Sequence, residues 1–62
     1  MAATGEEIGY RDAIRQVHRS LERRLKALRD ALDGAEEARK AEIRVRIDEV
    51  EHIIRVVESL HR

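Results

Sequence analysis

Glu49 and His52 are the two residues whose types and spacing most directly suggest chemistry. They form a Glu-x-x-His sequence, which helical bundles use to hold pairs of iron or manganese ions at their centre. Such a site needs both side chains to point inward. Because a helix advances about 100° per residue, both lie on the side opposite Ile43, Val50 and Val57. We therefore expect Glu49 and His52 to lie on the surface.

A zinc site shared between two copies of the chain is a second metal hypothesis. Imidazole and carboxylate groups both suit Zn²⁺, so His18, Glu49 or His52 from two subunits could share one ion. An alternative interpretation needs no metal, because Asp48 and His52 are four residues apart and can pair on a helix surface. We favour the interpretation without a metal and expect no cofactor.

Covalent catalysis would require a nucleophile beside a base. The chain has no Cys, and its side-chain hydroxyls belong to Thr4, Tyr10, Ser20 and Ser59. A serine nucleophile needs a base within hydrogen-bond reach and a third group that orients the base. Ser20 and His18 are two residues apart, which places them on different sides of a helix. We therefore predict that the protein is not an enzyme.

A run of basic residues is the strongest local charge asymmetry. Its members, spaced mostly by four, are Arg11, Arg15, Arg19, Arg23 and Lys26. Like charges at this spacing repel by a few tenths of a kcal/mol each, and RNA or DNA would neutralise them. Asp12, Glu22 and Asp30 lie within one turn of several of these residues and could pair with them instead. The sequence favours a solvated face and keeps nucleic-acid binding as an alternative.

Two amphipathic helices are the elements that must position these residues. Apolar residues recur at gaps of three and four, which is the spacing of one helix face. The first run is Ile14, Val17, Leu21, Leu25, Leu28 and Leu32, and the second is Ile43, Ile47, Val50, Ile53, Ile54, Val57 and Leu60. Mostly polar residues separate the two runs, which favours a turn at Asp33-Gly34 over one continuous helix.

The predicted fold is all-α, a two-helix antiparallel hairpin forming a single domain over residues 1–62. Its first helix spans about 6–32, the turn 33–35 and the second helix about 36–61. Gly34 is predicted to be the left-handed residue that ends the first helix, and Asp33 to cap the second. Helices of near-equal length should lie side by side along their whole extent, with Val17 level with Val50.

The composition makes a partner necessary. The chain has 62 residues, of which 42% are apolar and 42% charged, as in helical bundles. A chain this short buries only about 60% of its unfolded surface, and without Cys it has no disulfide to compensate. The two apolar runs are therefore predicted to form an interface through which two hairpins make a homodimeric four-helix bundle. A helical protein partner is the other candidate.

Charge and hydropathy limit the remaining possibilities. Net charge is zero, with 13 basic and 13 acidic residues, so no global field attracts a polyanion. No stretch approaches the roughly 18 apolar residues of a membrane span, and the first residues lack the layout of a signal peptide. We expect a cytoplasmic protein that does not enter a membrane, acting as a non-enzymatic oligomerisation or protein-interaction module.

Overall fold

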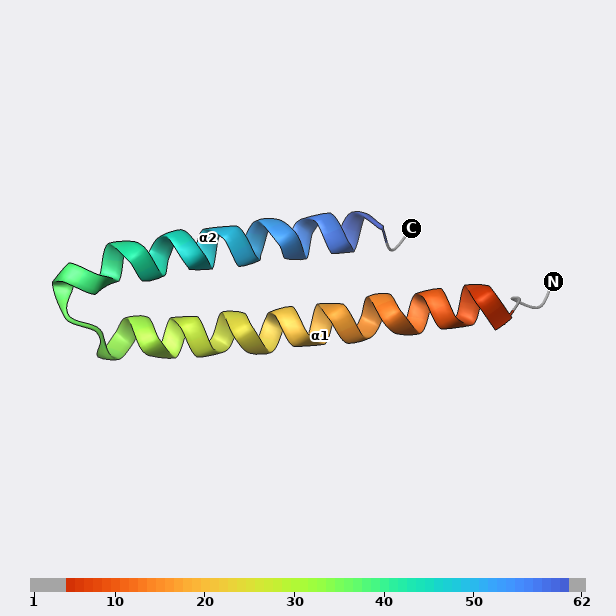
Figure 1. Ribbon diagram of the computed structural model, residues 1–62, viewed down its shortest axis with the longest axis horizontal. Coiled ribbons are helices and arrows are strands. Elements are labelled where there is room, and N and C mark those ends of the chain that lie inside the picture. Colours follow the sequence, from red (N-terminus) through yellow and green to blue (C-terminus); the bar gives the residue numbers. More distant parts are fainter. Residues whose placement is uncertain (1–4, 61–62) are drawn as a thin grey trace.

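The computed structural model describes residues 5–60, which form two α-helices joined by a short linker (Figure 1). Helix α1 spans Gly5–Gly34 and helix α2 spans Glu37–Ser59. Over this part of the chain there is no strand, and the prediction of an all-α fold is confirmed. The helices run antiparallel and pack against each other as a hairpin rather than continuing as one helix.

The chain reverses direction later than the sequence predicts. Helix α1 continues through Asp33 and Gly34, and the linker is Ala35 and Glu36. No described glycine has a positive φ, so the prediction of a left-handed Gly34 is wrong. Glu36 is the N-cap residue of α2, with φ −71° and ψ 155°, and its carbonyl accepts a 2.9 Å hydrogen bond from the Arg39 amide. Asp33 lies inside α1 and therefore does not cap α2. Helix α1 can continue through Gly34 because a glycine inside a helix costs only about 1 kcal/mol.

The helices are unequal in length and offset. Helix α1 has 30 residues and α2 has 23, and the amino-terminal turns of α1 extend past the end of α2 (Figure 1). The side chain of His18 reaches Glu58, whereas folding about Asp33-Gly34 predicts that Val17 is level with Val50. The prediction of contact along the whole extent is wrong, because the later reversal shifts α2 relative to α1.

A thin aliphatic seam joins the two helices. Its buried residues are Ile47, Val50 and Val57, all on α2. Half-buried residues complete it: Ile14, Leu21, Leu25, Leu28 and Leu32 on α1, with Ile43 and Ile54 on α2. None of the side chains that the structure describes is fully buried. Each helix covers only one side of the other, so the seam stays open to solvent along both edges.

The hairpin exposes more surface than a compact protein of its size. Its accessible surface is 5265 Å², whereas a compact monomer of 7.2 kDa exposes about 4100 Å². The radius of gyration is 15.5 Å, against about 10.6 Å for a compact domain of this length. The molecule is a flat rod of 54 × 16 × 11 Å, with about 1100 Å² of excess surface.

Candidate functional site

The exposed surface beside the seam has two faces of different chemistry. Ion pairs of His18 with Glu58 and of Arg29 with Glu51 bridge the helices along one edge of the seam, and we call this side the charged face. Because a helix advances about 100° per residue, a second group of side chains lies along the opposite edge of the seam. We call that side the apolar face; its large apolar side chains are Tyr10, Val17, Ile53 and Leu60.

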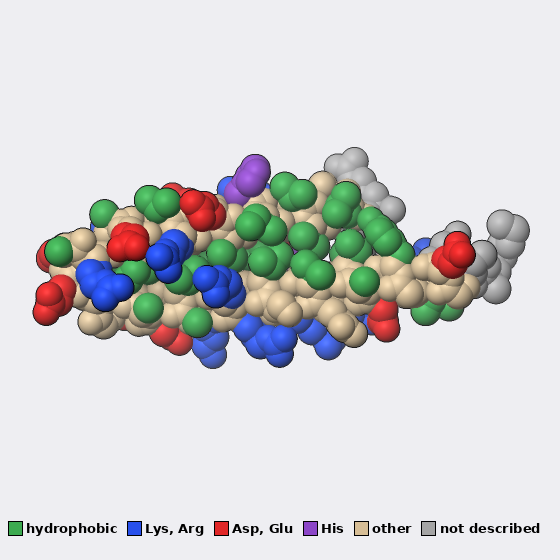
Figure 2. Space-filling view, viewed as in Figure 1, with side chains coloured by type: hydrophobic (Ala, Val, Ile, Leu, Met, Phe, Trp, Pro, Cys, Tyr) green, Lys and Arg blue, Asp and Glu red, His purple; other side chains and the backbone are tan. Residues whose placement is uncertain are grey.

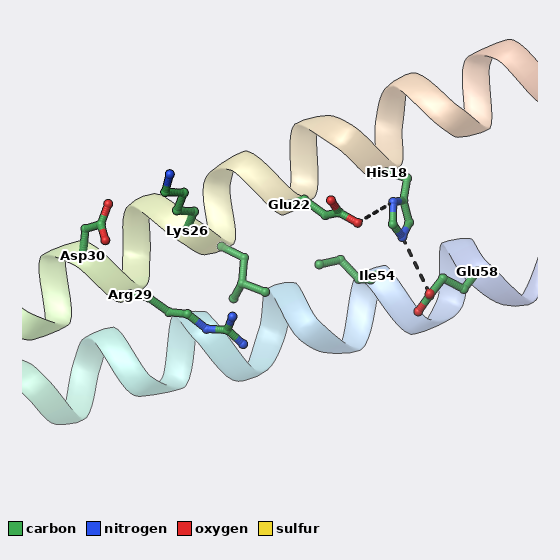
Figure 3. A pocket seen from close by; sticks show the side chains of 8 residues that line it. His18, Glu22, Lys26, Arg29, Asp30, Ile54 and Glu58 are labelled. Carbon is green, nitrogen blue, oxygen red and sulfur yellow. Dashed lines mark ion pairs between the residues drawn. The ribbon is translucent and has the colours of Figure 1, made fainter.

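His18 is the central residue of the charged face (Figure 3). Its side chain is 25% exposed, and its Nδ1 lies 2.9 Å from Oε1 of Glu22 on the same helix. Its Nε2 lies 3.7 Å from Oε2 of Glu58 on α2. A carboxylate lies beside each ring nitrogen, so the protonated imidazole links the two helices electrostatically. Glu22 lies four residues after His18, a spacing that can be seen in the sequence. Glu58 could not be identified from spacing, because the offset between helices decides which α2 residue faces His18.

An open groove of about 470 Å³ adjoins His18 on the charged face. Besides His18, Glu22 and Glu58, it is lined by Leu25, Lys26, Arg29, Asp30 and Ile54 (Figure 3). The two serine hydroxyls of residues 5–60 lie elsewhere: Ser20 Oγ accepts a hydrogen bond from Arg23, and Ser59 Oγ donates one to the carbonyl of Val56. The groove thus offers charge and an imidazole, but no serine nucleophile within reach of that imidazole.

The structure does not bring the three metal candidates together. His18 lies between two glutamates on the charged face, whereas Glu49 and His52 are exposed on α2 and do not line the groove. Within the part of the chain that is described, no three His, Cys, Asp or Glu side chains are placed to hold one metal ion. A zinc site from these residues would require ligands from a second chain.

The basic residues predicted to contact nucleic acid form an exposed flank of α1. All five side chains, which we call the basic flank, are exposed: Arg11, Arg15, Arg19, Arg23 and Lys26. Glu22, a carboxylate expected to pair with them, pairs with His18 instead. No ion pair joins the basic flank to any carboxylate whose side chain the structure describes. Its positive charge is therefore not neutralised by those carboxylates.

The apolar face gathers side chains that a lone hairpin leaves in water. Tyr10 is 54% exposed, Val17 47%, Ile53 45% and Leu60 50%. Figure 2 shows hydrophobic side chains over both helices in the half away from the turn. Of the 13 predicted interface residues, ten lie in the seam, and Val17, Ile53 and Leu60 do not. Tyr10 is not among the 13, although its position seven residues before Val17 places it on the same side of the helix.

The pair between His18 and Glu58 should contribute modestly to stability. We expect a double-mutant cycle of His18→Ala and Glu58→Ala to give a coupling free energy of about 0.5 kcal/mol, because Glu58 is 58% exposed and water screens the pair. Urea denaturation followed by circular dichroism measures this value. The same cycle on His18 and Glu51, which no ion pair joins, is the control and should give none. Coupling above about 2 kcal/mol would contradict a solvent-screened pair.

Comparisons with known protein families, with curated proteins and with solved structures find no match for this chain. Neither α1 nor α2 combines the length and the apolar character that crossing a bilayer requires.

Proposed function

We propose that the protein is a non-enzymatic oligomerisation module whose hairpin dimerises into a four-helix bundle through the apolar face. The observation that carries the proposal is the surface of 5265 Å², about 1100 Å² more than a compact monomer of this mass exposes. A standard protein interface covers about 800 Å² on each partner. One interface with a second copy accounts for most of the excess.

The thinness of the seam supports the same proposal. Of the side chains that the structure describes, only those of Ile47, Val50 and Val57 are buried within one hairpin. A chain of this length rarely gains enough stability from a single small core. A second hairpin on the apolar face would also remove Val17 and Ile53 from water, and fully burying such a side chain contributes about 1.5–3 kcal/mol. Folding and assembly are therefore expected to be coupled.

Thermal unfolding at several protein concentrations tests this coupling. If the folded state is a dimer, its midpoint rises with concentration, by about 5 °C for each tenfold increase for two chains of this length. Circular dichroism measures the midpoint. A midpoint independent of concentration would contradict the dimer and would leave the apolar face to a different helical partner.

Nucleic-acid binding is the second candidate function, and the unneutralised basic flank favours it. If it operates, the double variant Arg15→Glu with Arg19→Glu loses binding to structured RNA or duplex DNA, and the wild-type affinity falls steeply with salt. Fluorescence anisotropy at low salt measures both. Arg44→Glu with Arg55→Glu, at exposed positions of α2, changes net charge equally and should retain binding. Absence of wild-type binding at low salt would remove this candidate.

A further inference from the structure

The apolar face covers only half of the hairpin. Its large apolar side chains lie in the half away from the turn, which we call the open half: Tyr10 and Val17 on α1, with Ile53 and Leu60 on α2. In Figure 2, Lys and Arg side chains on the same face lie nearer the turn. A partner that covers the apolar side chains must therefore be centred on the open half.

The turn half of the same face is charged. Seven residues return a helix to nearly the same side, so Arg24 follows Val17 on this face and Arg46 precedes Ile53. Arg46 donates a 3.1 Å hydrogen bond to Glu42. One possible dimer has two hairpins that overlap along their full length, with their turns at opposite ends. In that dimer the apolar half of each hairpin would be buried against these charges. Removing water from Arg24 and from the exposed pair of Arg46 with Glu42 is unfavourable, which argues against that arrangement.

Two symmetric arrangements place the open half against itself. In a two-fold dimer the same patch on both copies forms the interface. Either the turns lie at the same end and the hairpins overlap fully, or the turns point in opposite directions and the hairpins are staggered about Val17. The end of α2 lies at this level, because His18 reaches Glu58 and the antiparallel register then puts Ser59 opposite Val17.

Charge around the turn decides between the two arrangements. Four exposed acidic residues and no basic residue lie between positions 30 and 37: Asp30, Asp33, Glu36 and Glu37. Turns at the same end would gather eight carboxylates within about a Debye length, roughly 8–10 Å. Turns at opposite ends keep the two acidic clusters apart. The staggered arrangement avoids this repulsion.

The stagger also gives the overhanging turns of α1 a neighbour. Tyr10 and Arg24 each lie seven residues from Val17, so a two-fold axis at Val17 aligns the Tyr10 ring of one copy with the Arg24 guanidinium of the other. Such a pair is attractive as a cation–π contact. On α2, Leu60 lies next to this level, so the Leu60 side chains of the two copies would meet near the axis. Ile53 lies six residues before Ser59, about 9 Å nearer the turn, and would face the overhanging turns of α1 in the other copy.

We infer that a second copy docks on the apolar face in this staggered arrangement, an inference that rests on the proposed dimer. The two turns point in opposite directions, so each acidic turn lies at an outer end of the dimer.

Distances between spin labels test the arrangement. The chain has no Cys, so Asp33→Cys carries a single nitroxide label per copy. Asp33 is sixteen residues from Val17, so the stagger places the two labels about 50 Å apart. Asp30→Cys, also exposed, should give about 40 Å and serves if the first variant does not fold. Gln16→Cys lies at the axis and should give less than about 30 Å in either symmetric arrangement.

Double electron–electron resonance measures these distances, and each outcome has a distinct meaning. A distance below about 30 Å at Asp33→Cys would overturn the inference in favour of turns at the same end. A distance near 35 Å would also overturn it, because docking at the middle of the hairpins gives about that value. No intermolecular dipolar signal at any site, from variants whose helicity matches the wild type, would refute the dimer itself and with it the inference.

Discussion

Val50→Asp is expected to unfold the protein and abolish assembly. Val50 is only 7% exposed at the centre of the seam, and burying an unpaired carboxylate there costs more than about 4 kcal/mol. A chain of this length has a total stability of roughly 3–9 kcal/mol. We expect most of the helical circular dichroism signal to be lost, with sedimentation showing a monomer.

Val45→Asp is the matched control for this prediction. It makes the same chemical change on the same helix, but Val45 is 56% exposed and lies on the side of α2 away from the seam. A surface substitution of this kind changes stability by about 0.5 kcal/mol, so helicity and mass should match the wild type. A Val50→Asp variant that retains its helicity would contradict the position of the seam.

Ile53→Asp is expected to dissociate the dimer. Ile53 is 45% exposed in one hairpin and would be covered by the second copy, so the substitution places one carboxylate per copy in the interface. A cost of about 2–3 kcal/mol in each copy corresponds to a dissociation constant raised by at least about a thousandfold. Sedimentation velocity over a dilution series measures this constant.

The comparison between Ile53→Asp and Val45→Asp separates the interface from the general surface. Both replace a partly exposed β-branched residue of α2 by aspartate, and they differ in the face they occupy. Val45→Asp should leave the dissociation constant within a factor of about three of the wild type. If Ile53→Asp dimerises as tightly as Val45→Asp, the apolar face is not the interface.

The helices and most of the seam could be predicted from the sequence. Gaps of three and four placed Leu25, Leu28, Ile47 and Val50 on inward faces, because helical periodicity is local and needs no knowledge of the partner helix. The phase of Glu49 likewise placed it away from the seam. Its exposure in the structure agrees with that expectation.

The turn and the offset could not be predicted, because they depend on small local free energies. Gly34 can end a helix or continue one, and the difference of about 1 kcal/mol is easily outweighed by packing elsewhere. Once α1 continues through Gly34, the facing residues change, and Glu58 becomes the neighbour of His18. The division between seam and apolar face follows from that offset, so spacing alone grouped Val17 with Leu21.

Sedimentation equilibrium of the wild-type chain is the most direct test of the claim that a second copy covers the apolar face. At micromolar concentration and above we expect a single species with twice the mass of the 7.2 kDa chain, dissociating on dilution. A monomer that keeps full helicity over the same range would contradict the account.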